Sequence, residues 1–486
     1  MRTTGVATRR VLLGGLAGGA TVLGAAACGD PSASTGGTSS APTQEKVTLR
    51  FLVPSASIDE SNTKMTPVWT ARNPNIAVEW QYADNVPQTV VTHAASGDLE
   101  DLLAQWMGTQ APQVWLTSGL TVPLDGYVKA QRINPRDWYK AIWEAAFVDG
   151  KQFSLPWQGQ VFGIALYYNK NVFDEVGVKY PDPSWTLDDL VSAADKLKLV
   201  QGSDVKRWGM GSGEESGTTS LIGERLPSHM RTFNAEMLSP DLKKFTWGDG
   251  PEFLRALSWY TDMMQRRPGL LYSRGSFKTD PAKGDPTIEP STEYAARLLE
   301  GRIAMGIRGW MGGTGRLANY IRTTPSARYG MSLSPKGPSG RRGGWVTSAA
   351  ASVSKASKHP DQAFQFLTAF SGHEWSLARG LQQTGSTTLN GRPDVYHDPQ
   401  LVQEPFFPKD VADMKARAMD FTEKDEDCSY SRGVMPNFYN TELWDAETQT
   451  IGKIVSGEAP ASQDMVTQLR QLVDVVMQKP RALTGK

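Results

Sequence analysis

The sequence predicts an α/β protein with a parallel sheet that carries helices on its faces. Apolar residues alternate over 47–53 and again over 76–82, and each run is typical of a strand. A helical pattern at 63–72 lies between them. A second helix is expected over 87–105 and a short strand over 113–116. Strand, helix, strand, helix, strand is the order that builds a parallel sheet with crossover helices.

Length and composition restrict the class of protein. A chain of 486 residues has room for two or three domains. The formal net charge is zero, which argues against a nucleic-acid-binding protein that neutralises phosphates. Only two cysteines occur, so a disulfide framework is excluded. One of them, Cys428, stands among acidic residues, and such surroundings disfavour a catalytic thiolate.

The first residues are expected to be an export signal rather than part of the fold. Residues 1–27 carry the pair Arg9-Arg10 before an apolar stretch, which resembles a twin-arginine signal. The small residues before Cys28 resemble a lipobox, which predicts lipidation of that cysteine; a plain Ala-x-Ala cleavage is the alternative. Residues 28–45 are rich in Ser, Gly, Thr and Pro and are expected to form a flexible tether. Taking the three arginines of the signal from 51 basic residues leaves 48 against 51 acidic ones, a formal charge of −3.

Three stretches together carry a family resemblance. The first runs through Tyr167-Tyr168-Asn169-Lys170 to Gly177, with Trp185-Thr186 beyond it. The second is Ser354 to Ala363, and the third is Met435-Pro436-Asn437 with a tryptophan some residues later. In this order they resemble the family 1 extracellular solute-binding proteins, which are the substrate receptors of bacterial ABC importers.

The resemblance implies a fold of the periplasmic-binding-protein-like type II class, with two α/β lobes, a hinge and a ligand cleft between the lobes. The first lobe is expected at 46–155 with parts of about 345–400. The second is expected at 156–344 with parts of 400–480. The implied protein is a monomer without cofactor or metal, held at the outer face of the cell membrane by the lipid on Cys28. It binds a sugar or oligosaccharide and passes it to the transmembrane subunits of a permease.

The candidate ligand contacts follow from this implied function. The chain has fifteen tryptophans, and an aromatic face can cover the flat C–H face of a sugar while polar groups bind its hydroxyls. The resemblance places Trp310 at the cleft. Loops after the first and third expected strands would also border it, because ligands meet the carboxyl ends of parallel strands. The aromatic candidates are Trp157, Trp310, Trp345 and Trp444, and the polar candidates are Ser57, Asp59, Ser118, Gln158, Gln160, Glu289 and Arg308.

Two other functions stay open at this stage. The sequence has no Gly-x-Ser-x-Gly, His-Glu-x-x-His, Gly-x-Gly-x-x-Gly or Walker motif, so no enzyme class is indicated. A secreted glycoside hydrolase would need only two carboxylates at the right separation, which a sequence does not reveal. A receptor for a solute that is not a sugar would keep the fold and change only the ligand.

Overall fold

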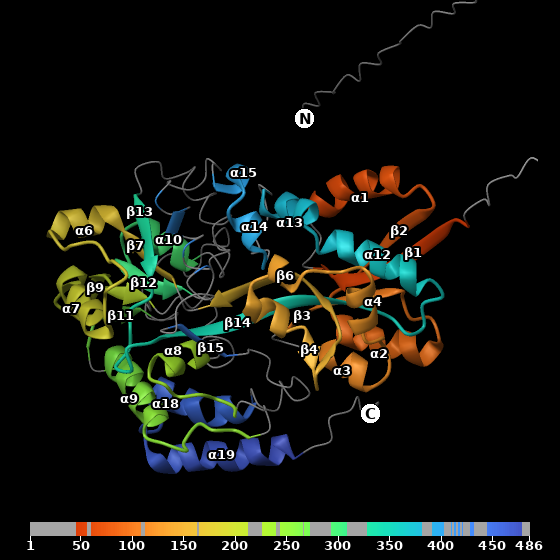
Figure 1. The fold of residues 1–486 in the computed structure, drawn as a ribbon. Helices are drawn as coiled ribbons and strands as arrows, with labels where there is room; N and C mark the ends of the chain where they lie inside the picture. The colour runs from red at the N-terminus through yellow and green to blue at the C-terminus, as the bar shows by residue number, and fades with distance from the viewer. Residues whose placement is uncertain are drawn as a thin grey trace, which may run out of the picture. The chain divides into compact units, whose positions relative to one another are not determined.

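The computed structural model of the chain contains two large β-sheets, each with its own hydrophobic core (Figure 1). Two small two-stranded sheets, β4 Phe147–Val148 with β5 Lys151–Gln152 and β8 Leu199–Gln201 with β9 Asp204–Arg207, accompany them in the described residues. Contacts group Lys46–Lys486 into one unit, and the sheets lie within it. The structure describes residues 45–55, 60–107, 112–162, 165–211, 226–239, 244–265, 267–272, 293–308, 328–381, 391–402, 428–431 and 445–478, together with Asp410, Asp413, Met414, Arg417 and Asp420.

The first sheet has the strand order β15–β14–β3–β1–β2, and β6 also pairs with β14. Strands β1, β2 and β3 run parallel to one another. The sequence predicts the first two of these strands and their parallel pairing. The strands are β1 Val47–Pro54, β2 Ile76–Ala83, β3 Leu102–Met107, β6 Leu155–Phe162, β14 Arg342–Val353 and β15 Cys428–Ser431.

Helices cover both faces of this sheet because successive side chains of β1 point to opposite sides. Phe51 belongs to a core rich in aromatic rings, where it meets Phe370 edge-on at 5.1 Å between ring centroids. Leu52 belongs to a smaller cluster on the other face, with Leu103 and Trp115. The helices of the aromatic side include α1 Glu60–Arg72, α12 Pro360–Phe370 and α13 His373–Gly380; those of the other side are α2 Val86–Ser96 and α3 Pro112–Thr117.

The second sheet is mixed, with the order β11–β10–β12–β7–β13. Its core combines residues from the middle of the chain with residues near the C-terminus, such as Leu166, Leu257 and Leu469. Its strands are β7 Ala165–Asn169, β10 Met210–Gly211, β11 Leu271–Tyr272, β12 Met305–Arg308 and β13 Tyr329–Leu333. The helices of this half include α6 Lys170–Val176, α7 Leu187–Leu197, α8 Leu226–Thr232, α9 Glu252–Gln265, α10 Glu293–Leu299, α18 Lys453–Ser456 and α19 Gln463–Met477.

Asn169 explains why the Tyr-Tyr-Asn-Lys stretch folds as it does. The residue is 1% exposed and ends β7. Its side-chain oxygen accepts from the backbone N–H of Val172 at 3.1 Å, which caps α6. Its amide nitrogen donates to the carbonyl of Leu298 at 2.7 Å and so ties the end of α10 to the same point. Gly177 then ends α6 with φ 74°, a left-handed conformation that favours glycine.

Two expectations about the first sheet are wrong. The helix expected over 87–105 stops at Ser96, because Gly97 adopts φ 74° and the N–H of Asp98 bonds back to the carbonyl of His93. The rest of that range includes the start of the third strand, β3, which runs from Leu102 to Met107. The strand expected over 113–116 is part of α3 instead. A short apolar run does not distinguish a strand from a buried helical turn by periodicity.

The division of the sequence between residues 155 and 156 falls within β6, directly after its first residue. Strand β6 pairs with β14 in the first sheet, and the chain enters the second sheet with β7 at Ala165. Strand β14 likewise pairs with β3 in the first sheet over 348–353. The chain therefore crosses between the sheets directly after β6 and again between β13 and β14.

The environment of His229 on α8 predicts a pH dependence of stability. Its ring packs against Trp259 at 5.0 Å and Phe233 at 5.3 Å, and its Nε2 is buried without a hydrogen-bond partner. Burial lowers the pKa of His229 to about 4. Between the ordinary pKa near 6.5 and this value the unfolded chain binds a proton that the folded chain does not, so stability falls as pH drops through that window.

Between pH 7 and pH 4 the titration of His229 should lower the unfolding free energy of the wild-type protein by an amount on the order of 3 kcal/mol. We expect His229→Phe to lack this decrease. Urea denaturation at both pH values measures it. His359→Gln is the control, because the His359 side chain makes no capping hydrogen bond at α12. If the His229 variant keeps the pH dependence of the wild type, the buried imidazole of His229 is not its cause.

Candidate functional site

The carboxyl ends of the parallel strands in the first sheet lie at one edge. Strands β1 and β3 run side by side, with Phe51 opposite Leu102, and they end at Pro54 and Met107. Strand β14 crosses this edge, because its residue Ser348 is opposite Met107. The β14 residues before Ser348 therefore extend past the ends of the parallel strands, where open α/β sheets bind their ligands.

The second sheet presents the ends of two strands to the same stretch of chain. Ala165, at the start of β7, is opposite both Arg308 at the end of β12 and Leu333 at the end of β13. Only two residues separate Ala165 from Phe162, the last residue of β6. Strands β6 and β14 thus lead from the first sheet to the edge of the second, as Figure 1 shows.

We call the segment where β6 and β14 extend from the first sheet to the edge of the second the strand crossing. Its backbone carries or borders four of the sequence-predicted ligand contacts. On the paired strands, Gln158 is opposite Ala349, Gln160 is opposite Thr347, and Trp345 is opposite Phe162. Arg308 ends β12 beside the start of β7. Among the other candidates, Ser57, Asp59, Glu289, Trp310 and Trp444, together with the lipidation candidate Cys28, lie outside the described residues.

Trp157 lies in the core of the first sheet and not on an open surface. Its side chain is 1% exposed, its ring lies 5.2 Å from that of Phe370, and the guanidinium of Arg379 stands 4.9 Å from its centroid. A ring enclosed in this way has no face free to stack on a sugar. The structure therefore gives Trp157 a packing role. Its neighbour Gln158 is 3% exposed.

The reasoning that led to Ser118 is wrong. Ser118 was expected in a loop after a third strand at 113–116, but it follows helix α3, and its N–H bonds to the carbonyl of Val114. The third strand ends at Met107 instead. Ser118 therefore does not stand at the carboxyl end of a strand.

A β-bulge in β6 is the feature of this site that the sequence did not reveal. Gln158 is opposite Ala349 and Pro156 is opposite Ala350, so Trp157 is an extra residue in the ladder. The donors that bind the carbonyls of this bulge come from residues 18 to 222 positions away in the sequence. No local pattern could have indicated them.

Asp410 and Asp420, two helical residues ten positions apart, contact different halves of the protein, meaning the parts built around the first and the second sheet. Asp410 accepts from the ammonium of Lys170, at the start of α6, at 2.5 Å. Asp420 accepts from the hydroxyl of Tyr139 at 3.2 Å and lies 3.0 Å from Nε2 of His397. Burial, followed by the charge of Asp410, raises the pKa of Tyr168 to about 12, so this tyrosine stays neutral.

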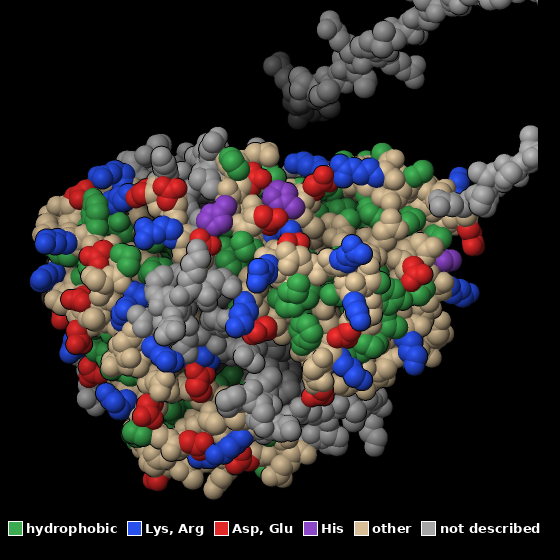
Figure 2. All heavy atoms as spheres, viewed as in Figure 1, with side chains coloured by type: hydrophobic (Ala, Val, Ile, Leu, Met, Phe, Trp, Pro, Cys, Tyr) green, Lys and Arg blue, Asp and Glu red, His purple; other side chains and the backbone are tan. Residues whose placement is uncertain are grey.

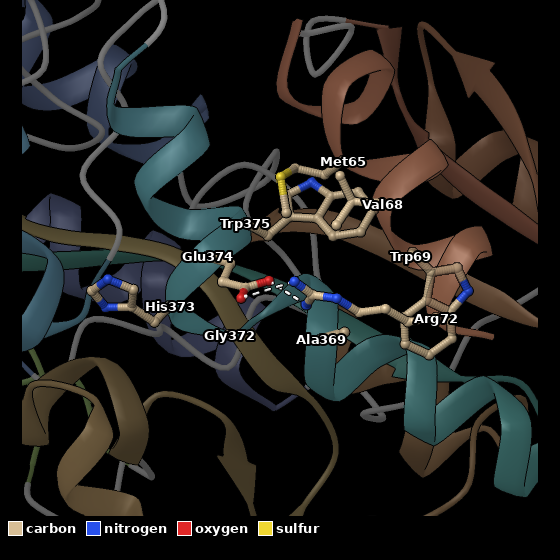
Figure 3. Close-up of a pocket in the computed structure, with 9 residues that line it drawn as sticks. All are labelled: Met65, Val68, Trp69, Arg72, Ala369, Gly372, His373, Glu374 and Trp375. Atoms are coloured by element: carbon tan, nitrogen blue, oxygen red, sulfur yellow. Dashed lines mark hydrogen bonds and ion pairs between the residues drawn. The ribbon is translucent and has the colours of Figure 1, made fainter.

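A cavity of about 280 Å³ lies between α1 and α13 (Figure 3). Met65, Val68 and Trp375 supply apolar walls, and Arg72 binds the carboxylate of Glu374 through two hydrogen bonds at 2.6 and 3.3 Å. Both members of this ion pair are about 60% exposed, so it adds little to stability. None of the sequence-predicted site residues lines this cavity.

The described residues show neither a metal site nor a membrane-spanning helix. Within the described ranges, no group of three or more His, Cys, Asp or Glu could hold a metal ion. The same ranges contain no helix long and apolar enough to cross a membrane. On the face that Figure 2 shows, Lys, Arg, Asp and Glu side chains are interspersed.

The chain belongs to the bacterial extracellular solute-binding protein family, whose model matches residues 52–376. It is therefore a substrate-binding protein of the kind that serves ABC importers outside the cytoplasm, and this family and its fold are those of transport proteins that are not enzymes. A putative binding protein of Brucella abortus is 26% identical over 330 residues, which cover 66% of this chain and 70% of that protein.

Solved structures show that the fold is of the periplasmic-binding-protein type II class, as predicted. A sugar transporter protein of Rhizobium etli in an open conformation superimposes with a TM-score of 0.67 at 20% identity, over 88% of this chain and 99% of that one. An ABC substrate-binding protein of Listeria monocytogenes in complex with cycloalternan gives 0.65 at 18% identity, over 90% of this chain and 100% of that one.

The backbone of β6 leaves no room for a side chain at Gly159. A Cβ there would lie 2.6 Å from Cγ2 and 2.7 Å from Cδ1 of Ile142. We expect Gly159→Ala to lower the unfolding free energy by about 1–3 kcal/mol through overpacking. Thermal denaturation measures it, and Gly126→Ala is the matched control, because a Cβ at Gly126 meets nothing within 4 Å.

A double-mutant cycle tests the cause of the strain at Gly159. Combining Gly159→Ala with Ile142→Ala should cost less than the sum of the two single changes, because the new methyl group fills space that Ile142 leaves. Additive effects would show that the strain does not arise from this contact.

Proposed function

We propose that this chain captures a sugar or oligosaccharide between its two sheets and delivers it to the permease of an ABC importer. The observation that carries the proposal is the strand crossing, where Gln160 and Trp345 lie on paired strands beyond the carboxyl ends of β1 and β3. Arg308 borders the same place from the second sheet. Tryptophan, glutamine and arginine are residue types whose side chains can cover the apolar face of a sugar and bind its hydroxyls.

The mechanism needs no covalent chemistry. A solute that contacts both halves at once gains interactions in a closed state that an open state cannot offer, and this difference shifts the population toward closure. The closed form then presents the solute to the permease. The Listeria protein of the same fold is in complex with cycloalternan, an example that supports a carbohydrate as the first ligand class to test.

A receptor for a solute that is not a sugar is the second candidate. Such a receptor would use the same segment of β6 and β14 to bind a different class of solute. The formal charge of −3 without residues 1–27 and the interspersed surface charges give no support to an anionic solute (Figure 2). The glycoside hydrolase reading is not favoured, since the family and the fold are those of transport proteins.

We further propose that the chain is exported through its twin-arginine signal and anchored by a lipid on Cys28, with residues 28–45 as the tether. The support is the order of features: Arg9-Arg10, an apolar stretch, small residues and then the cysteine. Such a protein would act as a monomer at the outer face of the membrane, close to its permease.

The solute is tested by tryptophan fluorescence and thermal stability of residues 29–486 with glucose, maltose, maltotriose, cellobiose, mannobiose and mannitol. We expect one of these to give a saturable shift and to be recovered unchanged. Trp345→Ala should weaken that binding about tenfold or more, because a stacking surface is lost. Trp80→Phe is the control, since Trp80 packs against the core of the first sheet.

The other outcomes separate the candidates. A cleaved sugar would establish the hydrolase in place of the receptor. If no compound of the panel shifts the protein, the saccharide proposal fails and the solute belongs to another class.

The anchor is tested by fractionating cells that make the protein. We expect the wild-type chain in the membrane fraction and Cys28→Ala in the soluble one, because a diacylated cysteine supplies the hydrophobic anchor. Cys428→Ala is the matched control and should remain membrane-bound. An N-terminus that begins after the Ala-x-Ala sequence and carries no lipid would overturn the anchor and support the plain cleavage.

A further inference from the structure

Three side chains from separate elements donate hydrogen bonds to three consecutive backbone carbonyl groups at the bulge in β6. Trp138 donates from its indole Nε1 to the carbonyl of Pro156 at 3.0 Å. Arg379 donates from Nη1 to the carbonyl of Trp157 at 3.1 Å. Ser348 donates from Oγ to the carbonyl of Gln158 at 2.9 Å. We call these three donors the carbonyl clamp.

The members of the clamp are themselves held firmly. Trp138, Ser348 and Arg379 are 5%, 1% and 0% exposed. They come from separate parts of the first half: the segment after the 3-10 turn Pro135–Asp137, strand β14 and helix α13. Three buried donors on different elements fix the bulge more tightly than a ladder bond alone would, because each is anchored independently.

Arg379 is the central member of the clamp. Its guanidinium lies 4.2 Å from the ring centroid of Phe370 and 4.9 Å from that of Trp157, and its Nη2 donates to the carbonyl of Phe370 at 2.8 Å. A buried charge is costly, and an apolar side chain of similar volume often stabilises a core more. The presence of arginine here is therefore better explained by positioning the backbone than by stability.

The bulge lies directly before the residues of β6 that lead to the proposed solute site, so the clamp affects their direction. A bulge bends its strand and re-aims the residues next to it. The residues that follow are Gln158, Gly159 and Gln160, and Gly159 is fitted against Ile142 without room for a Cβ. The path of β6 toward the proposed solute site is thus set by buried groups behind the strand.

We propose that Arg379, Trp138 and Ser348 are positioning residues for the solute: they hold the bulge so that residues 158–160 take the direction that binding requires. This inference rests on the proposed function. The clamp touches no solute itself, and it acts through the backbone of β6. A binding site whose supporting groups are loose by a fraction of an ångström loses affinity.

The first test compares two neighbouring tryptophans in the full chain. Trp138→Phe removes the donor to Pro156 and keeps an aromatic ring. Trp143→Phe makes the same change in the neighbouring ring, whose centroid lies 5.1 Å away and which shares the same core. We expect Trp138→Phe to weaken binding of the responding sugar of the panel about fivefold, the effect of one hydrogen bond, and Trp143→Phe to leave it unchanged.

Arg379→Met and Arg379→Lys form the second test. Methionine keeps apolar bulk beside Trp157 and Phe370 but donates to neither carbonyl, so we expect at least a tenfold loss of affinity. Lysine keeps a charged donor and should restore part of the affinity. Ser348→Ala removes only the donor to the carbonyl of Gln158, so it tests the clamp if the arginine variants do not fold.

Hydrogen exchange of the free protein gives a readout that needs no ligand. Exchange at residues 155–162 should speed up at least tenfold in Arg379→Met, while β2 in the same sheet should keep its wild-type rate. Equal affinity in wild type, Trp138→Phe and Arg379→Met, or unchanged exchange over 155–162, would overturn the clamp. If no sugar of the panel shifts the wild-type protein, the saccharide function fails, and the exchange rates alone then decide the clamp.

Discussion

The antiparallel pairing of β6 with β14 is the constraint on which both halves of the protein depend. Strand β14 has twelve residues and, at about 3.3 Å per residue, spans roughly 40 Å. Its first residue, Arg342, donates to the carbonyls of Ser334 and Pro183, beside the second sheet. Its last residue, Val353, is buried in the core of the first. One strand is thus fixed at each end by a different half, and a solute bound along it as proposed would contact both.

The motif residues of the family serve this architecture more than they serve a ligand. Asn169 caps α6 and ties it to α10, and the ring of Tyr168 packs against that of Phe173 with 5.3 Å between centroids. A Cβ at Gly330 would lie 2.3 Å from the Tyr168 ring, so that strand must carry glycine there. The motif therefore predicts the fold, and the fold in turn predicts the function. That is why the family could be inferred from sequence while the solute could not.

The sequence predicts elements whose signals are local and misses contacts that join distant segments. The alternating strand at 47–54 and the helix at 360–370, with its proline at the start, were both predictable from their own residues. Strand β3 was not, because a helical turn and a short strand share the same apolar pattern, and only pairing with β1 and β14 decides between them. The family resemblance makes Trp157 a ligand candidate, but Phe370 and Arg379, more than 200 residues away, enclose it.

The enclosure of Trp157 fits the proposal that β6, the strand that carries Gln158 and Gln160, must keep its position when a solute binds. A ligand shifts the balance between open and closed states only by the difference in its contacts to each. If the strand moved with the solute, part of that difference would be lost in rearranging it. The indole of Trp138 and the guanidinium of Arg379 donate to carbonyls of β6. Groups fixed in this way would hold the strand in place before a solute binds. The groups that recognise the solute can then be few, because the backbone that carries them is already in place.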